Sequence, residues 1–461
     1  MKQYDAIIIG GGGGLKLRPI TMLGKKVAII EKEDLGGTCL NRGCIPSKML
    51  IYPADFLTHI KEDLPHHFSK MSGEITSDFS ALVTDLNKTV QADSAGIHAN
   101  YEKNDTFDFY HGEAKFIENK IIEVNGEQIT AEKIFVATGT RPSVPNIEGL
   151  EGTPYMTSRE LLQKNELPKK MIVFGGGYIA VELGHAFGAF GTDVHFLVRS
   201  SMIKAEDKEI QKIFMDDFAK RYNVHFKVAP KKVEYKNEVF YVTCEDEDGK
   251  TFIMESDALF VATGVRPNSD DLGLENTDIV LDEKGFIQTN EYLETAVEGV
   301  YALGDVRGKH LFRHAVNYEG EYLLRTLYVE QVREPLDYGP MPHAIFTYPQ
   351  IAGVGVTEQE LQAEGKQEGV DYVIGTNEYK KSAYGMAMKP SIGLVKIIVN
   401  KKDRKIIGCH IIGADSATFL HMMIAYMKMN ATIDHVVDTI FIHPAFPEIM
   451  RNAARKIMAK M

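Results

Sequence analysis

The sequence predicts an α/β fold with two copies of a βαβ unit, because one short pattern occurs twice along the chain. Each copy begins with an apolar run that ends in a glycine cluster, at residues 5–14 and again at 171–182. Each continues to a nearly identical stretch, IFVATGTRP at 134–142 and LFVATGVRP at 259–267. A short apolar run before a glycine cluster is typical of a buried parallel strand. The longer interval in the first copy predicts an insertion there.

Length and composition narrow the class of protein. A chain of 461 residues, 44% hydrophobic and 25% charged, is long enough for about three globular domains. The formal net charge of −12 argues against nucleic acid or an anionic membrane as a partner. No apolar run approaches the roughly 18 residues of a membrane span, and the run at 6–9 is too short for a signal peptide. We therefore expect a cytoplasmic enzyme.

The first glycine cluster fits a Rossmann-like dinucleotide-binding turn only in part. Such glycines allow a tight turn, a close approach to a pyrophosphate and close helix packing. Gly10 and Gly12 are in place, but Leu15 stands at the third position and Pro19 should shorten or kink the helix. A glycine-rich loop without a ligand is the alternative for this copy alone, and the repetition favours a nucleotide site.

The second cluster fits better, since Gly175, Gly177 and Ala180 occupy the three positions.

In the first copy an acid also stands where the pattern requires one. Glu31 ends the apolar strand at 27–30, about 20 residues past the glycines, where a carboxylate binds the ribose hydroxyls of adenosine. The pair of clusters therefore predicts two dinucleotide sites.

The corresponding position in the second copy carries no acid. Residues 198–200 read Val-Arg-Ser, and an arginine there suits the 2′-phosphate of NADP rather than NAD. Arg199 is the predicted phosphate contact and Lys204 a possible second one. A solvated basic loop is the alternative interpretation.

Two of the four cysteines lie together in the stretch GGTCLNRGCIPSK at 36–48. Cys39 and Cys44 are five residues apart, which in a straight helix is about 7.5 Å, whereas a disulfide prefers Cα atoms roughly 4.4–6.8 Å apart. Pairing needs an irregular turn, which Gly43 and Pro46 permit. A disulfide in a protein whose other cysteines are reduced is usually catalytic.

Half of a zinc site is the alternative for this pair. It needs two further ligands, and the remaining cysteines, Cys244 and Cys409, stand alone in the sequence. The adjacent His66 and His67 lie in a polar stretch that is more typical of a solvated loop. We therefore expect a redox pair and no metal site.

With these motifs in place, the chain resembles the flavin-dependent pyridine-nucleotide–disulfide oxidoreductases, the family of glutathione reductase, mycothione reductase and dihydrolipoamide dehydrogenase. The resemblance covers nearly the whole chain, and the cysteine stretch is its most specific part. Residues 295–305, which end in Gly304 and Asp305, resemble the second FAD motif. Residues 346–355 resemble the start of the dimerisation domain, and 443–448 resemble the C-terminal acid–base dyad.

The resemblance implies two Rossmann-like dinucleotide-binding domains plus a C-terminal α/β dimerisation domain. The expected boundaries are an FAD domain at 1–147, an NAD(P) domain at 148–265, a return to the FAD domain at 266–338 and an interface domain at 339–461. Three features resemble those of mycothione reductases: the segment from Gly10 to Glu31 is shortened, Arg199 follows the second strand of the second copy, and the C-terminal motif is similar. The wording CLNRGCIPSK is common among dihydrolipoamide dehydrogenases. The extra C-terminal cysteine pair of mercuric reductases is absent.

The implied cofactors are FAD and NADPH, with NADH less favoured. The residues expected to bind FAD are Gly10, Gly12, Glu31, Thr38, Lys48, Ala114, Gly139 and Asp305. Those expected to bind NADP are Gly175, Gly177, Tyr178, Ala180, Arg199 and Gly264. Tyr178 would gate the nucleotide side of the flavin, with simple helix packing as the alternative. Lys48 and Glu182 would form an ion pair beside the flavin ring.

The resemblance also assigns the catalytic roles. Cys44 is the flavin-proximal thiol, and Cys39 attacks the substrate disulfide and forms a mixed disulfide that Cys44 resolves. His443, held by Glu448, would protonate the leaving thiolate. In this family the dyad comes from the other subunit, which predicts a homodimer.

The main functional hypothesis is an NADPH-dependent reductase of a low-molecular-weight disulfide, similar to mycothione reductase. The alternative is a dihydrolipoamide dehydrogenase, which oxidises dihydrolipoyl groups with NAD⁺ as part of a 2-oxoacid dehydrogenase complex. A flavoprotein without catalytic function is a third hypothesis, against which the intact cysteine pair and dyad argue. The sequence does not identify the disulfide.

Overall fold

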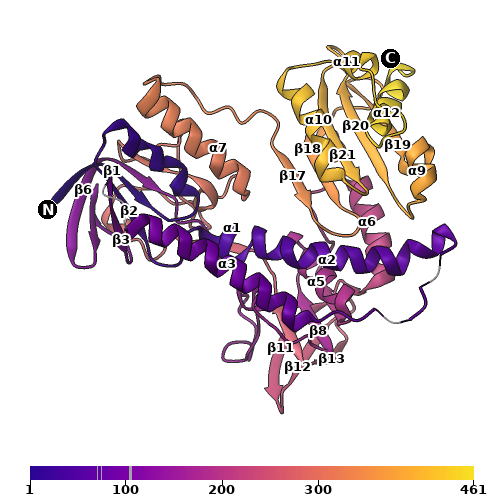
Figure 1. The fold of residues 1–461 in the computed structure, drawn as a ribbon, viewed down its shortest axis with the longest axis horizontal. Helices are drawn as coiled ribbons and strands as arrows, with labels where there is room; N and C mark the ends of the chain where they lie inside the picture. Colours follow the sequence, from indigo (N-terminus) through magenta and orange to yellow (C-terminus); the bar gives the residue numbers. More distant parts are fainter. Residues whose placement is uncertain (70, 74, 103–105) are drawn as a thin grey trace. The chain divides into compact units, whose positions relative to one another are not determined.

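The computed structural model describes residues 1–69, 71–73, 75–102 and 106–461, which divide into two compact units (Figure 1). Unit 1 consists of Met1–Ser47, Val83–Val144 and Gly264–Tyr338. Unit 2 consists of Lys48–Leu82, Pro145–Thr263 and Gly339–Met461. Strands and helices alternate in both units, which confirms the predicted α/β class. The four predicted domain ranges stay a prediction, and Lys48–Leu82 belongs to a different unit from the rest of 1–147.

Unit 1 is built on a seven-stranded sheet in the order β3-β2-β1-β6-β5-β4, with β16 beside β6. The strands β1, β2, β3, β6 and β16 are parallel where they pair. The bounds are β1 Lys2–Ile9, β2 Val27–Glu31, β3 Phe107–His111, β4 Lys115–Glu118, β5 Ile121–Val124, β6 Glu127–Val136 and β16 Val300–Ala302. The short β7 (Thr140–Pro142) pairs with β15 (Val265–Pro267). Apolar side chains on both faces are buried, as in a parallel sheet covered on both sides.

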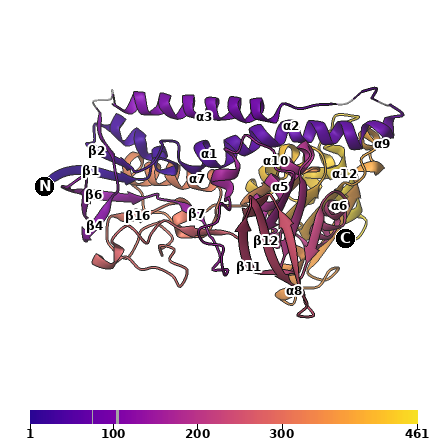
Figure 2. The same ribbon diagram turned by 90° about the horizontal axis from the view of Figure 1, so that it is seen from below.

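Unit 2 contains a parallel sheet in the order β10-β9-β8-β14. This order matches β3-β2-β1-β6 in unit 1, so the repeat in the sequence corresponds to a repeated topology. The bounds are β8 Lys170–Phe174, β9 Asp193–Val198, β10 Asn223–Phe226 and β14 Ala258–Val261. An antiparallel sheet of β11 (Ala229–Lys236), β12 (Val239–Glu245) and β13 (Thr251–Ser256) follows (Figure 2).

Within each copy of the repeat, the glycine cluster lies against the Ala-Thr-Gly motif. This contact explains why the two motifs recur together. A Cβ atom on Gly10 would lie 2.3 Å from the carbonyl oxygen of Ala137, and one on Gly175 would lie 2.3 Å from that of Ala262. Both alanines open an Ala-Thr-Gly motif at the end of a neighbouring strand. Gly10 and Gly175 also have φ of 114° and 125°, which L side chains rarely adopt. No other residue type fits either position.

The expectation for the third glycine of the first copy was wrong by one position. A Cβ atom on Gly14 would lie 2.7 Å from the Ile8 side chain, so Gly14, and not position 15, provides the close packing against the strand. The following segment η1, Gly13–Leu23, is a 3-10 helix that contains Pro19. Pro19 has no N–H to donate to an α-helical hydrogen bond, in agreement with the expected disturbance of the helix.

A third sheet, in the order β17-β18-β21-β20-β19, lies in unit 2. Helices α10 and α12 lie beside it, and their apolar side chains form one core with its strands (Figure 1). The strand bounds are β17 Pro342–Ile345, β18 Ile351–Gly355, β19 Tyr372–Glu378, β20 Leu394–Asn400 and β21 Ile406–Ile412. The helix bounds are α8 Glu358–Ala363, α9 Ala383–Met388, α10 Ser416–Lys428, α11 Ile433–Asp438 and α12 Glu448–Met458.

Two of the other helices begin at residues predicted to be functional, α2 at Cys44 and α5 at Tyr178. The bounds of these other helices are α1 Gly37–Arg42, α2 Cys44–Glu62, α3 Phe79–Glu102, α4 Ser158–Leu161, α5 Tyr178–Phe190, α6 Lys208–Arg221 and α7 Arg313–Leu324. The short helical turns are η2 Leu64–His67, η3 Leu274–Asn276, η4 Gly304–Arg307, η5 Arg325–Val329 and η6 Tyr379–Lys381. Over the described part of the chain, no helix combines the length and apolar character needed to span a membrane.

Candidate active site

The predicted FAD residues of unit 1 include two carboxylates and a glycine turn that suit a dinucleotide. Glu31 ends β2, and its carboxylate accepts hydrogen bonds from the Gly11 N–H at 2.6 Å and the Glu33 N–H at 2.8 Å. These bonds hold the carboxylate beside the glycine turn. Burial raises the pKa of Asp305 to about 6, and Thr140 Oγ1 at 3.2 Å is its hydrogen-bond donor. A desolvated carboxylate with few donors fits a sugar-alcohol hydroxyl, so these residues fit FAD.

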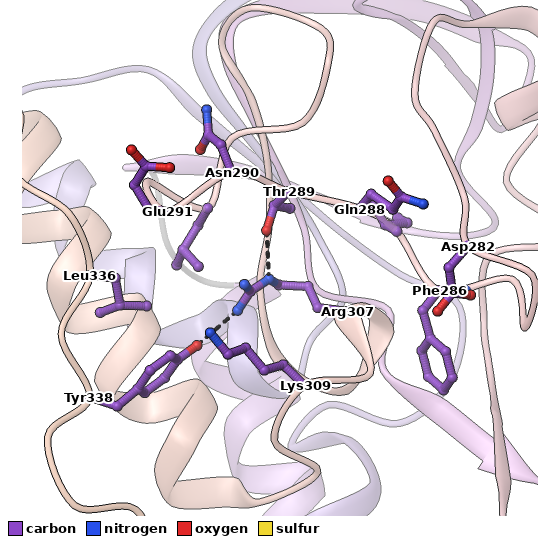
Figure 3. A pocket seen from close by; sticks show the side chains of 12 residues that line it. Asp282, Phe286, Gln288, Thr289, Asn290, Glu291, Arg307, Lys309, Leu336 and Tyr338 are labelled. Atoms are coloured by element: carbon purple, nitrogen blue, oxygen red, sulfur yellow. Dashed lines mark hydrogen bonds between the residues drawn. The ribbon is translucent and has the colours of Figure 1, made fainter. Parts of the chain in front are cut away.

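An internal ion pair supports the turn that carries Asp305. Arg307 lies at the end of η4 and donates to Tyr338 at 2.9 Å and to Thr289 at 3.0 Å (Figure 3). It also donates to Glu319 at 2.8 Å. Glu319 also accepts a hydrogen bond from the Gly304 N–H. A pocket of about 420 Å³ adjoins Arg307, but the guanidinium charge is already paired with Glu319. None of the predicted site residues lines this pocket.

Replacing Arg307 by methionine should destabilise unit 1. The side chains of Arg307 and Glu319 are only 8% and 1% exposed, and removing one partner of a buried pair costs about 3–5 kcal/mol. The matched control is Arg325→Met, since Arg325 pairs with Glu330 and Glu334 at the surface, where such pairs contribute about 0–1 kcal/mol. Urea unfolding, monitored by the release of FAD, gives the unfolding midpoint of each variant. Equal midpoints for the two variants would contradict the prediction.

The two cysteines of the motif meet across a break between helices. Helix α1 ends at Arg42 and α2 begins at Cys44, with Gly43 between them in a non-helical conformation. This is the irregular turn that the spacing requires, while Pro46 lies within the first turn of α2. Both cysteines are thiols, Cys39 half-buried and Cys44 exposed. A hydrogen bond with Cys44 and, next, burial raise the pKa of Cys39.

An ion pair in unit 2 joins α2 to α5. Lys48 Nζ lies 2.6 Å from Glu182 Oε2, as predicted for these two residues. The second carboxylate oxygen of Glu182 accepts the N–H of Phe346 at 2.8 Å, and Lys48 Nζ lies 4.4 Å from the centre of the Phe346 ring. These contacts fix the direction of the ammonium group. Phe346 is a contributor that the sequence did not identify.

Three of the predicted nucleotide residues lie at the N-terminus of α5. Gly177 is the N-cap residue of α5, Tyr178 is its first residue and Ala180 is fully buried. Free N–H groups at a helix N-terminus suit a pyrophosphate. Arg199 and Lys204 are exposed in the loop after β9, and within the described ranges neither forms an ion pair. Their charges are available to a phosphate.

The predicted dyad forms within unit 2. His443 Nδ1 lies 3.0 Å from Glu448 Oε2, and the carboxylate is buried while the histidine side chain is 69% exposed. The hydrogen bond from His443 lowers the pKa of Glu448, which also accepts hydrogen bonds from the Ala445 N–H at 3.2 Å and Arg451 at 2.8 Å. Nδ1 is occupied by Glu448, so Nε2 is the atom that can exchange a proton. Arg451, three residues after Glu448 on α12, was not identified from the sequence.

The remaining predicted residues lie at turns or in the core. Thr38 lies in α1, Ala114 is buried, and Gly139 and Gly264 have φ of 68° and 114°. Gly264 belongs to unit 1, unlike the other predicted nucleotide residues. Cys244 and Cys409 are buried thiols, and burial raises the pKa of Cys244 to about 11. In the described segments, no three His, Cys, Asp or Glu side chains are grouped so that they could hold a metal ion.

Two family models match this chain. The model described as pyridine nucleotide-disulphide oxidoreductase matches residues 4–321. The model of the dimerisation domain of the same family matches residues 341–454. Together they include all the predicted site residues.

Relatives and solved structures agree with the family models. A mercuric reductase of Staphylococcus aureus is 32% identical over 98% of this chain and 82% of its own length. A dihydrolipoyl dehydrogenase of Bacillus subtilis is 31% identical over 98% of this chain and 96% of its own length. The Cu(II) complex of the HOCl-induced flavoprotein disulfide reductase RclA from Escherichia coli has a TM-score of 0.86 at 26% identity, over 99% of this chain and 100% of that one. These relatives do not support the predicted likeness to mycothione reductases.

Proposed function

Because this chain belongs to the pyridine nucleotide-disulphide oxidoreductase family, and is a flavoprotein acting on a sulfur group, we propose that it is an NADPH-dependent reductase of a low-molecular-weight disulfide. The observation that carries the proposal is the position of Cys39 and Cys44 on either side of the helix break at Gly43. When bound, FAD and NADPH supply the two electrons that return the cysteine pair to its thiol form.

The cysteines and the dyad perform the exchange with the substrate. The Cys39 thiolate attacks one sulfur of the substrate disulfide, which breaks the substrate S–S bond and forms a mixed disulfide. His443 Nε2 gives a proton to the leaving thiolate, and Glu448 holds the imidazole in position. The Cys44 thiolate then attacks Cys39, which releases the second thiol and forms the Cys39–Cys44 disulfide. Two thiols leave for each disulfide consumed.

The dimerisation domain at 341–454 supports a homodimer. We propose that His443 acts on the cysteine pair of the partner subunit. One nitrogen of its exposed imidazole is occupied by Glu448, and among the described residues the other has no hydrogen-bond partner, so it can serve a group on another subunit.

Dihydrolipoyl dehydrogenase is the second candidate, since such relatives match this chain over nearly their whole length. The loop after β9 argues against it, because Arg199 follows the strand and no acid is present to bind the ribose of NAD. Reduction of the bound FAD by NADPH or NADH, followed by a panel of glutathione, mycothiol, lipoamide and coenzyme A disulfides, tests both proposals. Turnover only with dihydrolipoamide and NAD⁺ would establish the second.

The nucleotide preference should depend on Arg199. Replacement by glutamine removes a charge-assisted hydrogen bond to the 2′-phosphate, so kcat/KM for NADPH should fall about ten- to hundredfold while that for NADH stays unchanged. Lys402→Met, a change in an exposed turn, is the matched control. Steady-state rates with both nucleotides measure the effect. An equal fall for NADPH and NADH would show that Arg199 does not read the phosphate.

A further inference from the structure

An arginine contacts the predicted acid–base dyad and takes no part in the mechanism above. Arg451 lies on α12, three residues after Glu448, and its guanidinium donates to Glu448 Oε1 at 2.8 Å. The side chain of Arg451 is 21% exposed and that of Glu448 only 6%. Among the described residues this is the only hydrogen bond of the guanidinium, and its Nε is buried without an acceptor. The contact with Glu448 is therefore the polar interaction that the position of Arg451 serves.

The carboxylate of Glu448 is shared among three donors. Arg451 donates to Oε1, and the Ala445 N–H donates to Oε2 at 3.2 Å. His443 Nδ1 lies at almost the same distance from both oxygens, 3.1 Å from Oε1 and 3.0 Å from Oε2. One anchor on each oxygen keeps the carboxylate from turning, so both oxygens face the imidazole.

An aromatic ring holds Arg451 in this place. The guanidinium carbon lies 5.5 Å from the centre of the Phe441 ring, and a cation is attracted to the face of such a ring. Phe441 packs against the core of the third sheet, whereas its neighbours Ile440 and Ile442 are exposed. Arg451 thus joins α12 to the loop that carries His443, at the one residue of 440–442 that packs inward.

The elements around α12 supply no second cation to Glu448. Helix α12 packs against α11 and strands β19 and β20, and the rings of Tyr379 and Tyr384 contact Phe446 in the dyad loop. In the described part of the chain, neither tyrosine forms a hydrogen bond with the dyad. The same holds for every charged or titratable side chain on those three elements, which are Asp434, His435, Asp438, Tyr372, Glu378 and Lys396. Arg451, which is always protonated, is the permanent cation that pairs with Glu448.

We propose that Arg451 is a positioning residue for the acid–base dyad: it holds the Glu448 carboxylate toward His443 and offsets part of its charge, so that the imidazole can release the proton it receives. The inference rests on the proposed function in taking His443 as the acid–base group. A carboxylate without a second cation would hold the imidazolium form more firmly. Such a group works best when neither protonation state is strongly favoured at the working pH. Arg451 acts through Glu448, without contact with the reacting atoms.

The pH at which the His443 imidazole is half-protonated measures this effect. NMR of the FAD-loaded protein labelled with 15N-histidine gives that midpoint, and the signal of His443 is identified by its loss in His443→Gln. In Arg451→Met the proton-binding constant of the imidazole should rise about three- to tenfold, because nothing then offsets the carboxylate charge. Arg451→Gln should show a rise as well, since it keeps a donor but loses the charge, and it keeps the test decisive if the methionine variant does not fold. Arg451→Lys keeps the charge and should stay closer to wild type.

Two controls show whether the effect passes through Glu448. Arg455→Met removes an exposed arginine of the same helix, one turn further from Glu448, so the His443 midpoint should keep its wild-type value. In a Glu448→Gln background, Arg451→Met should cause almost no further rise, because no carboxylate charge is left to offset.

The outcomes separate this inference from the proposed function. An unchanged midpoint in the folded neutral variants of Arg451 would overturn the positioning role. So would an equal rise in Arg455→Met, which would reflect the total charge of the helix, or an undiminished rise in the Glu448→Gln background, which would show a direct action on His443. The titrations need neither nucleotide nor substrate, so these results leave the proposed function intact. If neither NADPH nor NADH reduces the wild-type flavin, the proposed function fails even where the titrations behave as expected.

Discussion

Replacing Cys44 by serine should lower the turnover of a disulfide substrate at least about a thousandfold, because the resolving sulfur is lost. Reduction of the bound flavin by NADPH should persist, since the predicted nucleotide residues are unchanged. The variant should also stop at a defined point. Reduced Cys39 still attacks the substrate, so one half of the substrate stays attached to Cys39 as a mixed disulfide and one thiol is released.

Mass spectrometry after a single addition of substrate measures this product. Cys44→Ser should gain the mass of one substrate half on Cys39, whereas Cys39→Ser should lose activity to the same degree without forming a stable adduct on Cys44. Cys244→Ala is the matched control, since Cys244 is a buried thiol outside the motif. An adduct on Cys44 in Cys39→Ser, with none on Cys39 in Cys44→Ser, would reverse the two roles.

The parts of the fold that the sequence predicted well are those that depend on local patterns. The glycine clusters, the two Ala-Thr-Gly motifs and the cysteine spacing each reflect a constraint within a few residues or between adjacent strands. The matching order of β3-β2-β1-β6 and β10-β9-β8-β14 follows from that repetition. The error at position 15 arose because spacing was counted for an α-helix, whereas Pro19 lies in a 3-10 helix and Gly14 makes the close contact.

The residues that the sequence missed are joined by contacts between distant segments. Phe346 meets Glu182 across 164 positions, and this pair has no periodic signature. Arg451 could have been found, since a Glu and an Arg three residues apart on a helix face the same side. Exposure and pairing decide which charges serve a site, and a single sequence shows neither.

Replacing His443 by alanine should reduce turnover of an aliphatic disulfide by about a hundred- to ten-thousandfold, the usual contribution of general acid–base catalysis. Two steps need the imidazole. The pKa of Cys39 is raised by its hydrogen bond with Cys44, so a base must take its proton before it can attack. The leaving alkyl thiolate then needs a proton, which Nε2 supplies while Glu448 holds Nδ1.

The loss should depend on the leaving group. An aromatic disulfide releases a thiolate that is stable without a proton, so His443→Ala should be impaired less with that substrate than with an aliphatic one. His421→Ala is the matched control, since His421 is exposed on α10 and bonds only to carbonyls of its own helix among the described residues. Glu448→Gln should lie between wild type and His443→Ala, because it keeps a side chain that can orient the ring. Normal turnover of the aliphatic disulfide by His443→Ala would rule out the acid–base role.

Mixed dimers decide from which subunit the histidine acts. If His443 serves the partner's cysteine pair, a dimer of one Cys39→Ser and one His443→Ala subunit contains one complete site, formed by Cys39 of the second subunit and His443 of the first. If His443 serves its own chain, both sites in that dimer lack one group. In either case each parent homodimer lacks one of the two groups at both of its sites. Activity should therefore appear after subunit exchange between the two variants, and continued inactivity of purified mixed dimers would place the histidine and the cysteines of each site on one chain.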